Sequence, residues 1–182
     1  MKPLSEEELG LLTGQLPEVF SLAILAHSGS PKRPDKAFRR HDGKTPYWVH
    51  PLWCAMALLQ EPNLSRQPRV VGAHTLALHD VLEDTTVGLP EWTHPLVKEG
   101  VEQMTFQSFS EERRLIWGRP EMIWLLKLYD KASNLLDGWP WMDNRGAEYR
   151  NMYEAFTLEL AERAQERFGE LKIVRIARAI CR

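Results

Sequence analysis

The chain has 182 residues, of which 43% are hydrophobic, and a formal net charge of −2 at pH 7. This length suits one well-packed domain over residues 1–182 and leaves little room for a second core, and the charge argues against wholesale electrostatic binding to nucleic acid. Because the two cysteines lack metal-ligand spacing, the N-terminus is acidic and no run approaches the roughly 18 apolar residues of a membrane span, we expect a cytoplasmic protein without a membrane segment.

Helical periodicity dominates the sequence, and convincing alternating strand patterns are absent, so we predict an all-α, multi-helix bundle. In chain order, helices are expected over residues 5–14, 17–29, 50–59, 69–83, 96–104, 120–136, 145–168 and 171–180. The first two are separated because Gly14 is expected to end the helix that the Ser5-x-x-Glu8 capping box begins, and Pro17 to start the next one.

Six residues of the predicted central helix, His79-Asp80-Val81-Leu82-Glu83-Asp84, include four side chains that bind metals or handle protons. Residues four apart share a helix face, so His79 and Glu83 are expected on one stripe, with Asp80 and Asp84 on the adjacent one. So much negative charge on one patch is unfavourable unless a cation or solvent offsets it. The segment is therefore typical of a divalent-metal hydrolase centre.

Further metal ligands are expected at His50 and Asp130. Pro51 disfavours the α conformation at His50, which places that histidine at or just before the start of a helix. Asp130 is an isolated carboxylate in an apolar helical run, and Asn134 follows one turn later on the same face. Together with the histidine and aspartate of the central helix, these ligands suit Mn²⁺, Fe²⁺ or Zn²⁺ better than Mg²⁺.

Each of these residues, taken singly, has an ordinary structural explanation. A His-Asp pair on a helix is usually a surface hydrogen bond, and His50 alone would more often cap a helix or lie in the core. Asp130 alone would most often pair with Lys127 or Lys131. The joint occurrence of all the elements favours the metal site.

The region from residue 32 to residue 44 is a basic loop. It contains the six cations Lys32, Arg33, Lys36, Arg39, Arg40 and Lys44 but only the two anions Asp35 and Asp42. In a chain of net charge −2, this concentration supports a small anionic substrate, although a solvated mobile loop has the same composition.

Four segments of the chain resemble motifs of a known family. They are Ala26-His27 with Arg40-His41-Asp42-Gly43 and Pro46-Tyr47-Trp48-Val49-His50-Pro51; Ala77 to Thr85; Val101-Glu102-Gln103-Met104-Thr105; and Lys127 to Asn134. The chain resembles the HD-domain superfamily, specifically the hydrolase domain of the RelA/SpoT group and its stand-alone small alarmone hydrolases. The likeness covers roughly residues 17–160, and the central segment matches its motif almost letter for letter.

The resemblance implies an all-α HD-domain bundle with a metal site between helices. His50, His79, Asp80 and Asp130 would hold the metal, usually Mn²⁺ in this family, with Fe²⁺ and Zn²⁺ as alternatives. Glu83 and Asp84 would be the catalytic carboxylates, and the spacing does not decide which of them is the base. Arg40, Lys44 and Asn134 would contact the substrate. The implied reaction removes the 3′-pyrophosphate of (p)ppGpp.

The chain departs from the family pattern in the basic loop. It inserts residues 30–39 or thereabouts, and His41 stands where lysine is common. A second hypothesis therefore keeps the metal centre and changes the substrate, for example to NADPH cleaved at its 2′-phosphate. A third is a non-catalytic HD module that acts as a regulator or antitoxin, which the loss of a ligand or a catalytic carboxylate would favour. The oligomeric state is not readable from the sequence.

The aromatic residues give one further expectation. Most of the seven tryptophans belong to apolar stripes, and core packing is the better explanation for them. Trp139 and Trp141, together with Tyr149 and Tyr153 on the next helix, are the candidates for stacking on a base. His27 is expected to be structural or on the surface.

Overall fold

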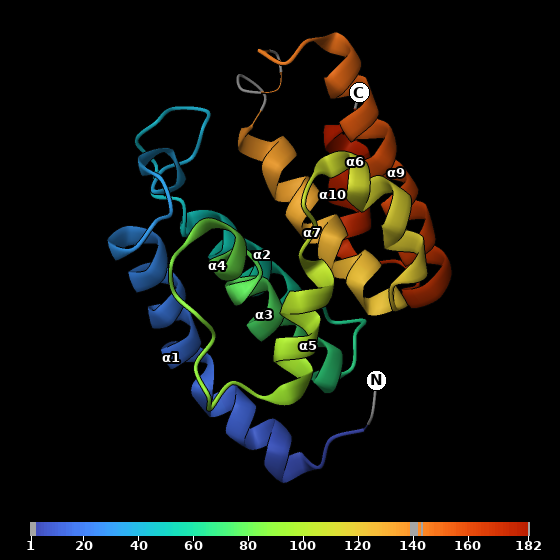
Figure 1. Cartoon of the computed structure of the whole chain (residues 1–182). Helices are drawn as coiled ribbons and strands as arrows, with labels where there is room; N and C mark the ends of the chain where they lie inside the picture. Colours follow the sequence, from blue (N-terminus) through green and yellow to red (C-terminus); the bar gives the residue numbers. More distant parts are fainter. Residues whose placement is uncertain (1–2, 139–141, 143, 182) are drawn as a thin grey trace.

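The protein is an all-α bundle. The computed structural model describes residues 3–138, 142 and 144–181 (Figure 1), and within these residues it contains no strand, only two isolated β-bridges. The helices are α1 (Glu6–Gly29), η1 (Pro34–Lys36), α2 (Val49–Leu59), α3 (Arg66–Leu78), α4 (Val81–Asp84), α5 (Pro95–Met104), α6 (Phe109–Leu115), η2 (Ile116–Gly118), α7 (Glu121–Asp137), α9 (Ala147–Phe168) and α10 (Lys172–Ile180).

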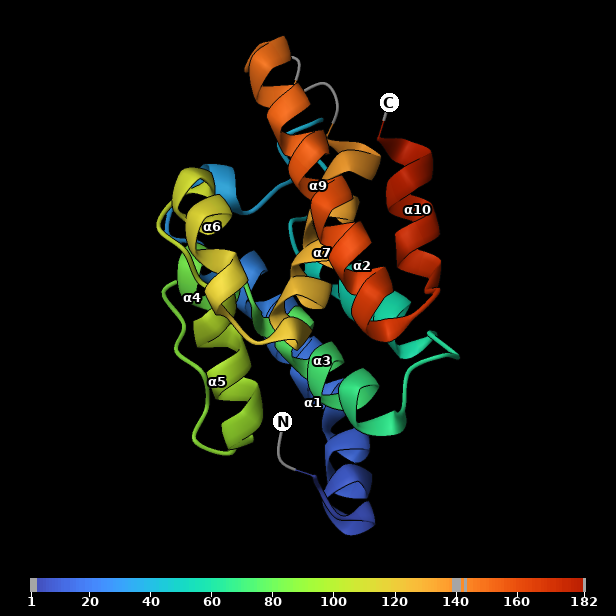
Figure 2. The ribbon, with the colours of Figure 1, turned by 90° about the vertical axis from the view of Figure 1, so that its right-hand side faces the viewer.

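Helix α3 lies at the centre of one half of the molecule. Helices α1, α2 and α5 pack around it, and α7 joins this half to α9 and α10 (Figures 1 and 2). Every residue from Val70 to Leu78 is buried, because α3 is surrounded on all sides. Helices α2, α3 and α7 therefore meet in the interior, where side chains from each can lie close together.

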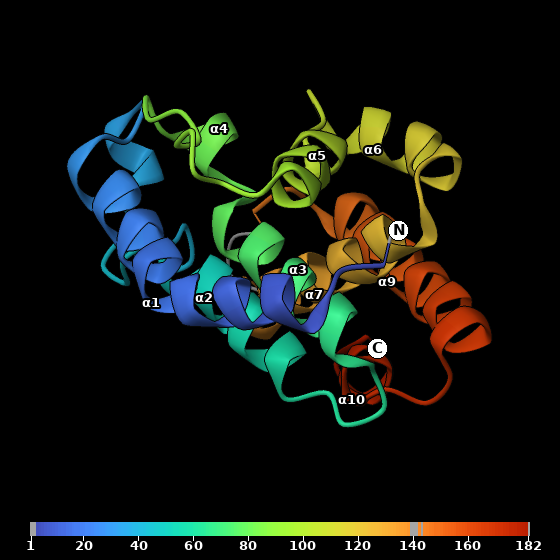
Figure 3. The same cartoon turned by 90° about the horizontal axis from the view of Figure 1, so that it is seen from below.

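Helix α1 is one continuous helix, so the prediction of a break at Gly14 and Pro17 is wrong (Figure 3). The capping box at Ser5 and Glu8 is formed as predicted. A proline inside a helix removes one backbone hydrogen bond and costs about 3 kcal/mol. The buried stripe that runs along the whole helix outweighs that loss, because Leu9, Leu12, Val19, Ala23 and Ala26 all pack inward.

The same helix bears on the prediction of no membrane segment. By length and composition α1 could cross a membrane, with a mean hydropathy of 1.5 over 18 residues, so the expectation that no segment meets this criterion is wrong. A helix in the core of a folded domain meets the same criterion, and α1 packs against α2, α3 and α4.

The predicted central helix is interrupted at His79 and Asp80, so the prediction of one helix over residues 69–83 is wrong. Helix α3 ends at Leu78, and α4 is a single turn from Val81 to Asp84. His79 Nδ1 donates to the carbonyl of Leu76 at 2.7 Å, which in a continuous helix would accept from the amide of Asp80. Asp80 itself has ψ −6°, far from the helical value near −42°. The His79 ring thus accounts for the break, because it competes with the Asp80 amide for the Leu76 carbonyl.

Gly72 allows α3 to approach its neighbours closely. A Cβ at this position would lie 2.6 Å from Leu58 Cδ2 and 2.7 Å from Met122 Cε. Leu58 is fully buried and has little room to move. We expect Gly72→Ala to lower the free energy of unfolding by about 1–3 kcal/mol, measured by urea denaturation.

Gly14→Ala is the matched control, because Gly14 is exposed and, in the described part of the chain, an added Cβ would meet nothing within 4 Å beyond the adjacent backbone of its own helix. There the substitution should raise the free energy of unfolding by about 0.5–1 kcal/mol. Equal effects of the two substitutions would contradict the close packing of α3.

Candidate metal centre

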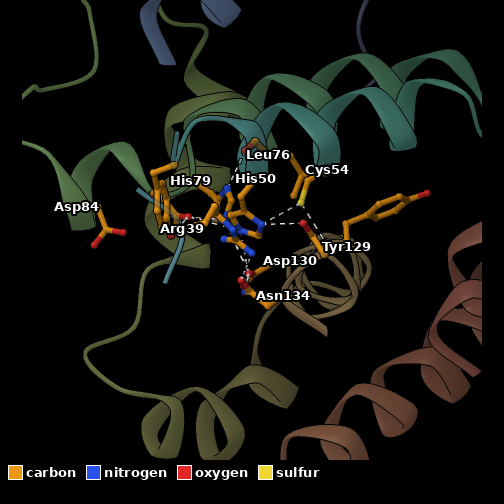
Figure 4. Close-up of polar contacts among 12 residues, drawn as sticks. Arg39, His50, Cys54, Leu76, His79, Asp84, Tyr129, Asp130 and Asn134 are labelled. Carbon is orange, nitrogen blue, oxygen red and sulfur yellow. Dashed lines mark hydrogen bonds and ion pairs between the residues drawn. The ribbon is translucent and has the colours of Figure 1, made fainter. Parts of the chain in front are cut away.

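His50 of α2, His79 after α3 and Asp130 of α7 come together in the interior (Figure 4). One ligand atom from each lies within 4.8 Å of the others, and all three residues are buried. His50 Nε2 is 3.3 Å from Asp130 Oδ1, and His79 Nε2 is 4.0 Å from the same oxygen. Asp80 adjoins this cluster, with its Oδ2 3.2 Å from His79 Nε2 and 3.6 Å from His50 Nε2. All four residues predicted as ligands are therefore adjacent.

Contacts of the Nδ1 atoms orient the imidazole rings of His50 and His79. His79 Nδ1 donates to the Leu76 carbonyl, and His50 Nδ1 lies 2.9 Å from Ser133 Oγ. Within the part of the chain that the structure describes, neither Nε2 atom has a hydrogen-bond partner, although both are buried. Two such imidazole nitrogens, fixed beside carboxylates, are typical ligands of a divalent metal ion. The residues fit a metal ion.

Asp130 is held in its ionised form by its own helix. Burial by itself would raise the pKa of this carboxyl, but Lys131 and Lys127 hold it well below its ordinary value. Their Nζ atoms lie 3.1 Å and 3.3 Å from Asp130 Oδ2. Oδ1 accepts a hydrogen bond of 2.8 Å from Asn134 Nδ2 and is the oxygen that faces the imidazoles. The lysines therefore occupy one oxygen of the carboxylate, and the other points to the metal site.

Tyr47 contacts both Asp80 and His27. The Tyr47 hydroxyl donates to Asp80 Oδ2 at 2.7 Å, and its ring centroid lies 4.9 Å from that of His27. Burial raises the pKa of Asp80, but His79 and His50 outweigh it and lower that pKa to about 2. His27 is fully buried, as a structural residue would be, and burial lowers its pKa to about 4.

Glu83 and Asp84, the predicted catalytic carboxylates, lie on α4, which follows directly after His79 and Asp80. Burial, together with the negative charge of Asp80, raises the pKa of Glu83 to about 7, and Glu83 Oε1 accepts from the Phe106 amide at 3.2 Å. Burial also raises the pKa of Asp84, whose Oδ1 lies 2.5 Å from Lys36 Nζ. Asp84 stands apart from the imidazole cluster in Figure 4.

A cavity of about 420 Å³ opens in front of these residues. Six cations line it: Lys36, Arg39, Arg40, Lys127, Lys131 and Arg145. Five acids line it as well: Asp80, Glu83, Asp84, Glu112 and Asp130. The aromatic residues Phe106, Phe109, Tyr149 and Tyr153 complete one wall. Such a cavity can accept an anion of nucleotide size with an apolar or aromatic part.

The predicted substrate contacts divide into two groups. Arg40 and Asn134 line the cavity, whereas Lys44 is exposed and lies outside its lining, so its contact with the substrate stays a prediction. The Lys44 side chain projects from a turn in which Asp42 accepts the amides of Lys44 and Thr45.

Arg39 is the cation of the basic loop that sequence reasoning undervalued. It is buried, and it donates to Asp137 at 2.6 Å and 3.1 Å and to Asn134 Oδ1 at 3.0 Å. Asn134 in turn donates to Asp130, so a chain of hydrogen bonds joins the loop to the metal site (Figure 4). No local signal separates Arg39 from its neighbour Arg40.

Two buried lysines are further residues that sequence reasoning did not place in the site. From the sequence, Lys127 and Lys131 are expected only as ordinary salt-bridge partners of Asp130. In the structure both line the cavity, and Lys131 also pairs with buried Glu112 at 2.8 Å. A signal was available, because charged residues inside an apolar helical run require buried partners. Tyr149 and Tyr153 line the cavity, whereas Trp139 and Trp141 lie outside the described residues.

The contact between Ser133 and His50 leads to a test of metal binding. Ser133→Ala would leave His50 Nδ1 without its nearest acceptor and free the ring to turn. We expect the affinity for Mn²⁺, measured by calorimetric titration, to fall by about 10–100-fold. Ser21→Ala is the control, because Ser21 Oγ donates to Pro17 on the exposed face of α1. An unchanged affinity in Ser133→Ala would contradict an orienting role for Ser133.

His27 predicts a loss of stability in acid. The unfolded chain protonates this ring near pH 6.5 and the folded chain only near pH 4, so stability falls as the pH drops between these values. The loss reaches about 3 kcal/mol for one ring. In the described part of the chain neither ring nitrogen has a partner, so His27→Phe breaks no hydrogen bond there and keeps a ring against Tyr47.

In metal-free buffer, urea denaturation of His27→Phe should therefore show a free energy of unfolding that depends less steeply on pH from 6.5 to 4. Identical slopes in the variant and the original protein would show that His27 does not remain neutral in the folded state.

Comparisons with known proteins bear on the fold. No family model matches the chain, and no curated protein matches it. Among solved structures, the chain is similar to one described as a metazoan ortholog of SpoT that hydrolyzes ppGpp and plays a role in starvation responses. The two have 20% sequence identity and a TM-score of 0.65, and the match covers 99% of this chain and 96% of that chain. The prediction of an all-α bundle is therefore confirmed, and the chain shares its fold with that structure.

Proposed function

We propose that the protein is a metal-dependent nucleotide pyrophosphohydrolase that removes the 3′-pyrophosphate of (p)ppGpp. One observation carries the proposal: two buried imidazole nitrogens without a partner in the described chain face the ionised carboxylate of Asp130, which lines a cavity together with six cations. The structural neighbour, described as hydrolyzing ppGpp, supports the choice of substrate. The proposed setting is the cytoplasm, with a small anionic nucleotide as the partner.

His50, His79, Asp80 and Asp130 would hold the ion, which we take to be Mn²⁺, with Fe²⁺ and Zn²⁺ as alternatives. When bound, the ion supplies charge stabilisation for phosphate oxygens and lowers the pKa of water. Tyr47 and Asn134 would fix the two carboxylates, because each donates a hydrogen bond to one of them.

Glu83 is our assignment for the general base. A carboxyl with a pKa of about 7 is half ionised at neutral pH, which suits it to accept a proton from the attacking water. The amide of Phe106 holds Glu83 Oε1, so the carboxylate has a fixed orientation. Asp84, which is paired with Lys36, would orient the water.

Cations of the cavity other than Lys36, which pairs with Asp84, would bind the phosphates. Arg40 would contact the substrate at the rim, and guanidinium groups match phosphate oxygens bidentately. The aromatic wall of Phe109, Tyr149 and Tyr153 would take the base, because stacking accepts any base. Because stacking does not select one base, the aromatic wall gives equal support to the second candidate, a hydrolase of another phosphorylated nucleotide such as NADPH.

A panel of nucleotides incubated with Mn²⁺ tests the proposal. We expect release of pyrophosphate from (p)ppGpp and no release of phosphate from NADPH. Phosphate from NADPH alone would support the second candidate. No turnover of any nucleotide, together with tight binding of one, would support the non-catalytic module.

Glu83→Gln tests the assignment of the base. We expect kcat to fall by about 100-fold or more with Mn²⁺ affinity retained, because amides do not accept a proton at neutral pH. In the original protein kcat/KM should rise with pH up to about pH 7, where Glu83 loses its proton, and then level off. Glu102→Gln on the exposed side of α5 is the control. Full activity of Glu83→Gln would refute the assignment.

A further inference from the structure

The segment from Ser30 to Lys36, within the insertion of the basic loop, runs beside α4 and the residues that follow it. The amide of Lys32 donates to the carbonyl of Asp84 at 2.8 Å, and the amide of Thr86 donates to the carbonyl of Ser30 at 2.9 Å. Pro31 and Thr85 form an antiparallel β-bridge between these two contacts. The inserted segment therefore pairs with the chain at the end of α4.

Two lysine side chains of the same segment also reach α4. Lys32 Nζ donates to the carbonyl of Leu82 at 2.7 Å, and Lys36 Nζ lies 2.5 Å from Asp84 Oδ1. Lys36 is mostly buried, with 22% of its side chain exposed, and it lines the cavity. Arg33, another cation of this segment, has 61% of its side chain exposed and pairs with Asp35.

Helix α4 requires this support because it is a single turn of four residues. One turn does not form stably alone, and its terminal carbonyls need partners outside the helix. The inserted segment supplies partners to the carbonyls of Leu82 and Asp84. The side chain of Asp84 is only 6% exposed, so its charge also requires a cation nearby.

We propose that the inserted segment is a strap that fixes α4, and that Lys36 is a positioning residue that places the carboxylate of Asp84 for catalysis. The proposal rests on the proposed function, since it assigns Lys36 a role in the same reaction. It also gives the inserted segment a role in positioning a catalytic carboxylate, and not in recognising the nucleotide. The competing role is direct binding of a substrate phosphate by Lys36.

Lys36→Met tests the strap, because it keeps the length of the side chain and removes its charge. We expect kcat to fall by about 10–100-fold, since small displacements of a catalytic group reduce the rate on this scale. KM and the affinity for Mn²⁺ should stay within about two-fold. Hydrogen–deuterium exchange should become faster in residues 81–86 of the metal-free protein, which is a readout independent of activity. Arg33→Met is the matched control and should change none of these quantities.

Two further variants separate positioning from a general loss of structure. Lys36→Arg restores a cation beside Asp84 and should recover most of kcat. In an Asp84→Asn background, Lys36→Met should lower kcat no further, because the two residues act through one contact.

The proposal is overturned if Lys36→Met raises KM while kcat and the exchange of residues 81–86 stay unchanged, or if nothing changes. If instead the proposed function is wrong, the original protein will release no pyrophosphate at all. In that case the exchange experiment still tests the strap.

Discussion

The structure depends on one electrostatic arrangement, an ionised carboxylate that is shared between two lysines and two imidazoles in the interior. Lys127 and Lys131 hold one oxygen of Asp130. The other oxygen faces the Nε2 atoms of His50 and His79, for which the described part of the chain offers no hydrogen-bond partner. A buried carboxylate is stable only with partners, and a buried imidazole nitrogen without a donor requires a ligand. An ion at this point would complete the contacts of His50, His79 and Asp130.

This arrangement requires the surrounding helices to approach one another closely. The ligands come from α2, from the end of α3 and from α7, so these helices must meet closely, and Gly72 makes such an approach sterically feasible. The interruption after Leu78 has the same origin, since the His79 ring takes a backbone carbonyl and turns its other nitrogen inward. Short α4 follows from that break, and it leaves Glu83 and Asp84 beside the metal site with an external support.

Much of the site could be predicted from residue types and spacing. His50 before a proline, the acidic stretch that begins at His79, and Asp130 in an apolar run each carry a local signal, and the structure places them together. The continuity of α1 through Pro17 could not be predicted, because packing along its length decides it. The buried position of Arg39 and the contact of Lys36 with Asp84 depend on how the insertion folds against residues far away in the sequence. Local patterns contain no information on such contacts.

The central claim is that the cluster of two histidines and Asp130 is a metal site. The most direct test is a crystal grown with Mn²⁺, in which the ion is located by its anomalous scattering. We predict one strong peak between the Nε2 atoms of His50 and His79 and the carboxylate of Asp130. A peak elsewhere in the cavity, or no peak at saturating Mn²⁺, would contradict the account.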